Sequence, residues 1–198
     1  MIDPMIVLAS RSPVRLRLLR EAGIEVEAVP SIIDERAVEE ALGGELSPTD
    51  LAEMLAETKA QEVSGRSPGR VVVGADQVLS LDGEVLHTPD DMEGARRRLL
   101  LLSGRTHVLH TAHVVMRDGA ALARHSETAS LTMRTLTPAE VGRAMALDED
   151  AMGTVGAYRI EGPGIRLFER IEGDHFAVLG LPMLPLLAAL REAGALDG

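Results

Sequence analysis

The chain has 198 residues, of which 45% are hydrophobic, and it carries a formal net charge of −11. With no Trp, one Tyr and two Phe, it lacks the positive charge and stacking rings of a nucleic-acid surface, so we expect no nucleic-acid partner. The absence of cysteine excludes a disulfide framework and a thiolate metal site, and it fits a cytoplasmic protein. The length suits one α/β domain, or two closely joined lobes, with an aliphatic core.

The sequence offers no targeting or membrane signal. The start, Met1-Ile2-Asp3-Pro4-Met5, lacks the basic region and long apolar run of a signal peptide. No apolar run in the chain approaches the ~18 residues that a bilayer span requires. We therefore expect no membrane partner.

The first predicted elements enclose an unusual turn. Residues 5–9 predict a buried strand and 13–22 a helix, and the turn between them reads Leu8-Ala9-Ser10-Arg11-Ser12-Pro13-Val14-Arg15. Ser12 is placed as the N-cap and Pro13 as the first helical residue. Helix N-termini favour acids, yet Arg11 and Arg15 bracket this one. Two guanidinium groups beside two serines and free N–H donors suit a bound phosphate. The alternative is that both arginines are solvated.

Other helix starts in the same chain serve as controls. They read Ser47-Pro48-Thr49-Asp50, Thr88-Pro89-Asp90-Asp91 and Thr137-Pro138-Ala139-Glu140. Each has an acid three residues after its cap, as a capping box prefers. The basic start of the first helix is the exception, which favours an anion site there.

The next segments carry charges whose roles the pattern leaves open. Residues 24–29 alternate as a half-buried strand with Ala28 inward, and Asp34-Glu35-Arg36 is expected to be an exposed cluster in a loop. Residues 48–63 predict a helix with Lys59 in its C-terminal half. Lys59 is the one lysine among 20 basic residues, which indicates either a specific role or chance.

A second informative stretch is Val71-Val72-Val73-Gly74-Ala75-Asp76-Gln77. Three consecutive valines predict a strand buried on both faces, and Asp76 is expected at its end. Ligands in α/β proteins bind at the carboxyl ends of such strands. A carboxylate there can bind a metal or accept a proton from water, whereas the alternative is an Asp that caps a turn.

The remaining chain predicts a mixed sheet. Hairpins are expected around Asp82-Gly83 and Asp118-Gly119, with strands at 78–81, 84–86, 106–116, 121–133 and 165–171. Helices are expected at 89–102, 138–147 and 181–193, and a glycine-rich segment at 152–164. The histidines of the second hairpin have no carboxylate or cysteine set around them, so we interpret them as structural or solvent-facing. The predicted fold class is α/β, a mixed twisted sheet with flanking helices.

Taken together, these motifs resemble the Maf (septum-formation inhibitor–like) family of nucleoside triphosphate pyrophosphatases. The resemblance extends from about Ile6 to Gly194, so residues 1–198 are taken as a single Maf-like domain. It implies two lobes around a cleft, as in inosine triphosphate pyrophosphatases, and a homodimer. The motifs are the Ser10–Arg15 turn, Asp34-Glu35, Lys59-Ala60, Gly74-Ala75-Asp76-Gln77, Leu102-Ser103-Gly104, Gly156-Ala157-Tyr158, Ile171-Glu172-Gly173-Asp174 and Leu179-Gly180-Leu181-Pro182.

The resemblance also implies a reaction and roles for particular residues. The reaction is hydrolysis of a nucleoside triphosphate substrate to the monophosphate and pyrophosphate with Mg²⁺ or Mn²⁺. Ser10, Arg15 and Lys59 would hold phosphates, with Arg11 and Ser12 in the same turn. Glu35 and Asp76 would serve the metal and the water, and Asp76 would accept the proton.

Substrate choice is expected to depend on Val14, Gln77 and Glu161, the positions where subgroups of the family differ. Gln77 and Glu161 resemble the subgroup that acts on 7-methyl-GTP, since a carboxylate can accept from the N1–H and N2–H₂ donors of guanine. Val14 resembles neither that subgroup nor the one that prefers dTTP and UTP. Thr88 and Thr154 stand where the family often has lysine. The alternatives are therefore a dTTP, UTP or CTP pyrophosphatase, and a non-catalytic nucleotide-binding regulator of septum formation.

Overall fold

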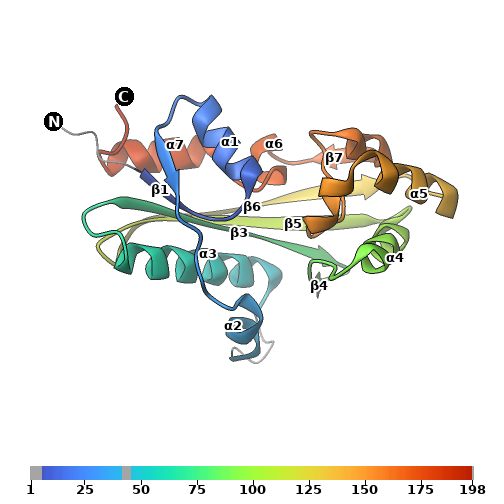
Figure 1. Cartoon of the computed structure of the whole chain (residues 1–198), viewed down its shortest axis with the longest axis horizontal. Helices are drawn as coiled ribbons and strands as arrows, with labels where there is room; N and C mark the ends of the chain where they lie inside the picture. Colours follow the sequence, from blue (N-terminus) through green and yellow to red (C-terminus); the bar gives the residue numbers. More distant parts are fainter. Residues whose placement is uncertain (1–5, 42–45, 198) are drawn as a thin grey trace. The chain divides into compact units, whose positions relative to one another are not determined.

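The computed structural model describes residues 6–41 and 46–197, so the expectations for residues 1–5 lie outside the described residues. Strands and helices are interspersed along the chain (Figure 1). The strands are β1 Ile6–Ala9, β2 Val26–Ala28, β3 Val71–Leu81, β4 Glu84–Leu86, β5 Thr106–Arg117, β6 Ala120–Met133 and β7 Phe168–Glu172. The helices are α1 Pro13–Glu21, α2 Glu35–Ala41, α3 Pro48–Gly65, α4 Met92–Leu102, α5 Pro138–Leu147, α6 His175–Val178 and α7 Met183–Glu192. Two 3₁₀ helices, η1 Glu149–Gly153 and η2 Pro163–Leu167, complete the list.

The strands form one seven-stranded sheet, and it is mixed, as the sequence predicts. Its order is β2-β1-β3-β5-β6-β7, with β4 paired to β3. β1 runs parallel to both β2 and β3. β4 pairs antiparallel with β3, and β7 pairs antiparallel with β6. The parallel ladder between β1 and β3 stops at the pair Ala9 and Gly74. β3 therefore continues past the end of its neighbour.

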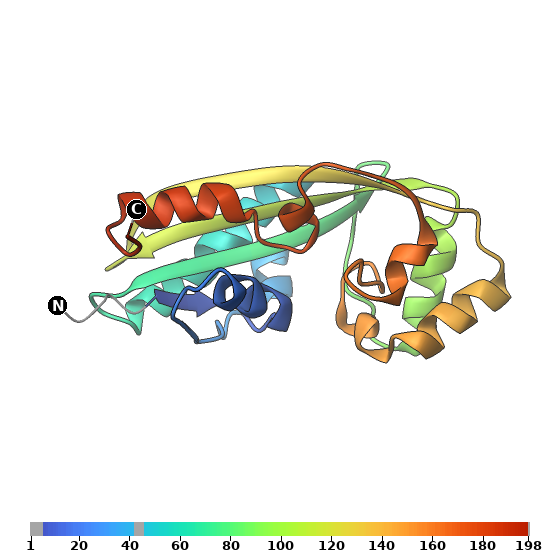
Figure 2. The same ribbon diagram turned by 90° about the horizontal axis from the view of Figure 1, so that it is seen from above.

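The chain divides into two compact units, and β3, β5 and β6 contribute to both. The first unit comprises Met1–Gln77, His110–Glu127 and Asp174–Gly198. Its core holds fully buried leucines of β1, α1 and α7, among them Leu8, Leu19 and Leu186. Figure 2 shows α7 along β5 and β6, where the Arg117 guanidinium donates to the Ala193 carbonyl over 2.8 Å. α1 and α7 thus cover one face of this part of the sheet, and α3 covers the other (Figure 1).

The second unit comprises Val78–Leu109 and Thr128–Gly173. Its core contains most of the chain's few aromatic rings. The Tyr158 and Phe168 rings pack edge to face with centroids 4.7 Å apart, and the Tyr158 hydroxyl lies 2.7 Å from His107 Nε2. The guanidinium of Arg98 donates to the carbonyls of Val155 and His87. Arg98 thereby holds the glycine-rich segment, residues 152–164, just before Tyr158.

The helix caps are largely as predicted. Ser12, Ser47 and Thr137 each cap a helix, and Thr137 with Glu140 forms a complete capping box. The prediction for Thr88 is wrong, because α4 begins at Met92 with Asp91 as its cap. Asp91 accepts from the Gly94 N–H over 2.6 Å. A carboxylate at this position also interacts favourably with the helix dipole, which explains why the helix starts there.

Three further expectations are corrected. Residues 78–81 are not a separate strand, because β3 runs unbroken from Val71 to Leu81 and Asp76 lies within it rather than at its end. The expected strand at 165–171 begins only at Phe168, because Pro163 starts a 3₁₀ helix before it. Ala28 is exposed rather than inward, since β2 pairs with β1 alone at the edge of the sheet.

None of the helices in the described residues is both long and apolar enough to cross a membrane.

Candidate functional site

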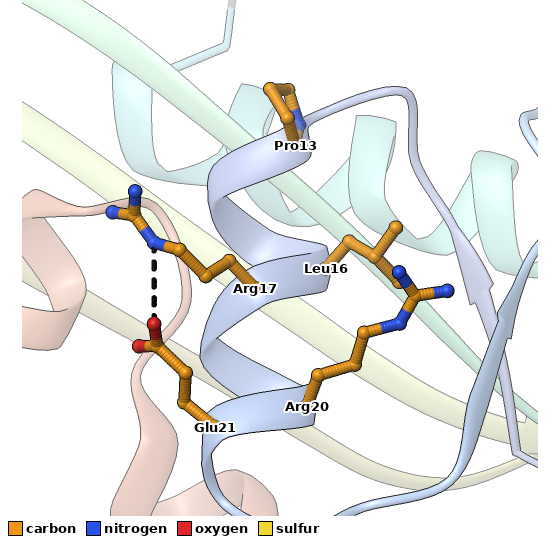
Figure 3. A pocket seen from close by; sticks show the side chains of 5 residues that line it. All are labelled: Pro13, Leu16, Arg17, Arg20 and Glu21. Carbon is orange, nitrogen blue, oxygen red and sulfur yellow. Dashed lines mark ion pairs between the residues drawn. The ribbon is translucent and has the colours of Figure 1, made fainter.

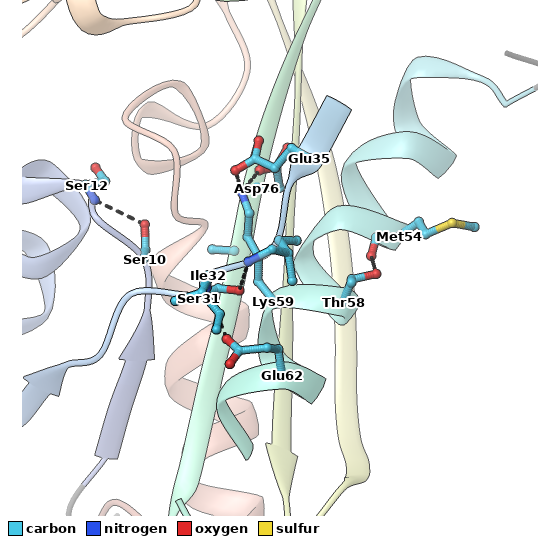
Figure 4. A network of polar contacts seen from close by, with 12 residues as sticks. Ser10, Ser12, Ser31, Ile32, Glu35, Met54, Thr58, Lys59, Glu62 and Asp76 are labelled. Atoms are coloured by element: carbon cyan, nitrogen blue, oxygen red, sulfur yellow. Dashed lines mark hydrogen bonds and ion pairs between the residues drawn. The ribbon is translucent and has the colours of Figure 1, made fainter. Parts of the chain in front are cut away.

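The candidate site is centred on Lys59, which α3 directs toward Asp76 of β3 (Figure 4). The Lys59 ammonium lies 2.7 Å from Glu35 Oε1, and it donates a short hydrogen bond to Asp76 Oδ1. Lys59 and Asp76 are 8% and 6% exposed, whereas the Glu35 side chain is 49% exposed. A buried amine thus joins two carboxylates, one of which reaches solvent.

Gly74 allows α3 to come close enough for this contact. A Cβ at Gly74 would lie 2.2 Å from the Ala56 carbonyl oxygen and 2.7 Å from the Ala60 Cβ. The backbone of β3 therefore packs directly on the turns of α3 that precede and follow Lys59. Any larger residue at position 74 must separate the strand from the helix.

We expect Gly74→Ala to lower the free energy of unfolding by about 3 kcal/mol, because the methyl group would meet backbone rather than a flexible side chain. Urea unfolding at neutral pH measures the change. Gly142→Ala in the interior of α5 is the matched control, since a Cβ there has nothing within 4 Å. That control is expected to gain about 0.5–1 kcal/mol. An unchanged midpoint for Gly74→Ala would contradict the close packing.

Glu35 reaches Lys59 because α3 also holds the segment that precedes α2. Glu62 accepts from the Ile32 N–H over 3.2 Å (Figure 4). Arg66 donates to the Pro30 carbonyl over 3.1 Å. Asp34 then caps the next helix by accepting from the Ala37 N–H. Glu35 is thus the first residue of α2, not part of a loop as expected. The cap Asp34 followed by an acid was the signal for this helix.

Burial and the neighbouring positive charges shift the pKa of Asp76 in opposite directions. Burial raises the pKa of the Asp76 carboxyl above its usual range, and the charges of Lys59 and Arg15 limit the rise. Burial lowers the pKa of Arg15, although Asp76 and Glu35 favour its charged form. The site therefore holds a carboxylate that is more basic than one in water but is still surrounded by cations.

The predicted anion turn folds as expected, but few of its donors are free. Ser12 caps the Arg15 N–H, and the Ser12 N–H donates to Ser10 Oγ over 3.2 Å (Figure 4). Arg15 Nη1 also donates to Ser10 Oγ, over 3.1 Å. The Ser10 oxygen thus accepts twice, and its own proton has no acceptor in the described part of the chain. Arg11 is exposed, and Arg15 is buried.

The three predicted specificity positions have different surroundings. Val14 is half-buried and packs on the core of the first unit. Gln77 lies beside Asp76 on β3, and its Nε2 donates to Thr111 Oγ1 and to the carbonyls of Ala177 and Val178. Glu161 is exposed and belongs to the second unit. The contacts of Gln77 were not foreseeable, because their partners are distant in the chain.

The histidines form no metal site. No group of three or more His, Cys, Asp or Glu side chains suited to a metal ion is found among residues 6–41 and 46–197. His107 and His113 are buried, whereas His110 is half-buried with its Nδ1 2.8 Å from Thr49 Oγ1. The carboxylates of Glu35 and Asp76, which meet at one ammonium, are the better candidates for holding a cation.

A separate pocket of 420 Å³ lies on the outer side of α1 (Figure 3). Its described lining consists of Pro13, Leu16, Arg17, Arg20 and Glu21. Arg17 Nε lies 3.9 Å from Glu21 Oε1 within it. None of the predicted site residues is part of this lining.

Comparisons with known proteins agree with the motif order. The family model described as Maf-like protein matches residues 5–193. A relative from Mesorhizobium japonicum, named 7-methyl-GTP pyrophosphatase, is 58% identical over 195 residues, which cover 98% of each chain. One from Nitrobacter hamburgensis, named nucleoside triphosphate pyrophosphatase, is 47% identical over 97% of this chain and 95% of its own.

Among solved structures, the dITP/XTP pyrophosphatase of Mycobacterium abscessus matches 73% of this chain and 93% of its own length. The sequence identity is 20% and the TM-score is 0.39.

Proposed function

The chain belongs to the Maf-like protein family, and from this we propose that it hydrolyses a nucleoside triphosphate to the monophosphate and pyrophosphate. The observation that carries the proposal is the Lys59 ammonium between the carboxylates of Glu35 and Asp76. A base, a cation and a second carboxylate at one point suit the attack of water on a phosphoanhydride. The names of the relatives support the same reaction.

In the proposed reaction, Asp76 takes a proton from the attacking water. The water oxygen bonds to the α-phosphorus, the bond from that phosphorus to the oxygen bridging the α- and β-phosphates breaks, and pyrophosphate leaves. The raised pKa of Asp76 suits this task, because a carboxylate of ordinary pKa is a weak base near neutral pH. Lys59 and the Ser10 hydroxyl would hold phosphate oxygens and offset the charge that develops on them.

The residues fit a divalent cation. Glu35 and Asp76 supply carboxylate oxygens on either side of the Lys59 ammonium, and Mg²⁺ is commonly held by one or two carboxylates together with substrate phosphates. When bound, Mg²⁺ or Mn²⁺ would polarise phosphate oxygens and neutralise their charge. We therefore propose a divalent cation as cofactor, held by Glu35 and Asp76.

For the substrate, we propose 7-methyl-GTP. The M. japonicum relative carries that name, and Gln77 and Glu161 match the subgroup that the sequence resembles. The Nε2 group of Gln77 is already used by protein acceptors, so this side chain would offer only Oε1 to a base. An acceptor suits guanine, which presents N–H donors.

The purified protein is expected to release pyrophosphate from 7-methyl-GTP at least about tenfold faster than from dTTP, UTP or CTP, which lack the guanine donor pair, since one well-placed polar contact is worth that much. The measurement is a panel of these nucleotides with Mg²⁺ or Mn²⁺, with both products identified. Activity on UTP but not on 7-methyl-GTP would overturn the argument from Glu161 and favour the pyrimidine alternative. No release from any nucleotide would favour the non-catalytic regulator.

The same proposal includes a cytoplasmic location and a homodimer. The homodimer stays a prediction from the family resemblance, and the cytoplasmic location stays one from the absence of cysteine.

A further inference from the structure

We propose that Arg15 is a positioning residue, which holds the backbone beside Asp76 instead of binding the phosphates of the nucleotide. Together with Gln77 it fastens the part of β3 that carries Asp76 to residues 177–180, the end of α6 and the turn after it. We call this set of contacts the Asp76 clamp. The inference rests on the proposed function, because it concerns how the base of that reaction is held.

The first half of the clamp is the Arg15 guanidinium. Its Nη1 donates to the Ala75 carbonyl over 2.8 Å, and its Nε donates to the Gly180 carbonyl over 2.7 Å. Ala75 directly precedes Asp76, and it lies just past Gly74, where pairing with β1 ends. Arg15 therefore provides a partner for β3 where β1 no longer pairs with it.

The second half of the clamp is the Gln77 amide, on the other side of Asp76 in the chain. Its Nε2 donates to the carbonyls of Ala177 and Val178 over 2.9 and 3.2 Å. Thr111 Oγ1 also lies 2.9 Å from that Nε2, and it donates in turn to the Ala177 carbonyl. Carbonyl oxygens can only accept, so they fix which end of the amide faces α6.

The two halves brace Asp76 from the face opposite Lys59. Successive side chains of a strand point to opposite faces, so Gln77 points away from the face on which Asp76 meets Lys59. Both neighbours of Asp76 in the chain are thus tied to residues 177–180. The turn approaches Arg15 closely, because a Cβ on Gly180 would lie 3.2 Å from Arg15 Nε. Gly180 also has a φ of +94°, which favours glycine.

Arg15 is buried, and its Nε and Nη1 are already used by oxygens of the protein. A phosphate could therefore be contacted only at Nη2, unless Arg15 gave up one of these contacts. Lysine can replace the charge of an arginine but not its planar set of donors. Substitutions at position 15 can therefore separate the effect of the positive charge from the effect of the planar guanidinium donors.

The test compares Arg15→Lys, Arg15→Met and Gln77→Met with the wild type. For each variant, kcat, KM and the inhibition constant of inorganic pyrophosphate are measured with the best nucleotide of the panel. We expect all three variants to lose kcat by about 10–100-fold through misplacement of the base. The pyrophosphate inhibition constant is expected to stay within about threefold in all three variants, since no phosphate ligand is lost. KM is expected to do the same in the two Arg15 variants, which keep the Gln77 contact proposed for the nucleotide base.

A phosphate-binding role gives a different pattern. Arg15→Met would then weaken pyrophosphate inhibition tenfold or more, which is about 1.4 kcal/mol of binding free energy. Arg15→Lys would retain most of the pyrophosphate inhibition. Gln77→Met would retain the wild-type kcat. That result would overturn the clamp. If Arg15→Met does not fold, the other two variants decide, because they separate the same outcomes. Arg20→Met, on the exposed end of α1, is the control and should match the wild type.

Failure of the clamp is distinguishable from failure of the proposed function. A wild type without pyrophosphatase activity contradicts the function. Amide hydrogen exchange then tests the clamp by itself. Arg15→Lys and Gln77→Met are each expected to speed exchange in both 75–78 and 177–181 relative to Arg20→Met. Unchanged exchange in both segments would refute the clamp.

Discussion

Asp76→Asn is expected to lower kcat for pyrophosphate release by about 10²–10⁴-fold, because an amide cannot accept the proton of the attacking water. The folded state should persist, since Lys59 keeps Glu35 as a counter-ion 2.7 Å away. Asparagine also has nearly the same shape as aspartate. The measurement is kcat with 7-methyl-GTP and Mg²⁺, with circular dichroism and urea unfolding to verify the fold.

The control for this substitution is Asp90→Asn, which makes the same chemical change at an exposed position. It should retain wild-type kcat. Lys59 is not a suitable control, because it contacts both carboxylates. Near-normal pyrophosphate release by Asp76→Asn in a folded protein would show that another group is the base. The roles of Glu35 and Lys59 would then need reassignment.

Local signals predicted much of what surrounds the site. The cap at Ser12 and the hairpins at Asp82-Gly83 and Asp118-Gly119 depend on neighbouring residues, and the structure has them where expected. The position of Asp76 within β3 was missed because Gly74-Ala75 reads as the end of a strand. Gly74 instead marks close packing against α3.

The contacts of Arg15 could not be predicted from local patterns. A basic residue in a helix's first turn suggested an anion, and that reading required the guanidinium to be free. Its carbonyl partners Ala75 and Gly180 lie 60 and 165 positions away in the chain. Only the tertiary fold brings them together, so the sequence indicated that Arg15 was unusual but not why. The anion that it suggested is still proposed for Ser10 and Lys59.

Acid is expected to destabilise the protein through two buried histidines. His107 and His113 are 0% and 1% exposed, and burial lowers the pKa of each from 6.5 to about 4. Arg98 adds to this effect on the pKa of His107, and His125 on that of His113. The unfolded chain binds these protons near pH 6.5 and the folded protein only near pH 4, so stability is lost as pH falls through this window.

The size of this effect makes it testable at a single position. A shift of this size corresponds to roughly 3 kcal/mol for each histidine, against a total stability of about 5–15 kcal/mol for a typical domain. His113 is the better position for substitution, because neither of its ring nitrogens has a partner in the described part of the chain. His107 is less suitable, since its Nε2 lies 2.7 Å from the Tyr158 hydroxyl.

His113→Leu is expected to be more stable than the wild type by roughly 3 kcal/mol at pH 5, because leucine fills a similar volume. About 2 kcal/mol of this arises because leucine takes up no proton, and about 1 kcal/mol from removing unpaired polar atoms. Near pH 8, where the histidine is neutral in both states, we expect a gain of about 1 kcal/mol from removing unpaired polar atoms. Urea unfolding at pH 5, 6, 7 and 8 measures both. The exposed His175→Leu should keep the wild-type pH dependence. If His113→Leu also kept the wild-type pH dependence of stability, His113 would have to take up a proton inside the folded protein. That result would contradict the argument that burial lowers its pKa.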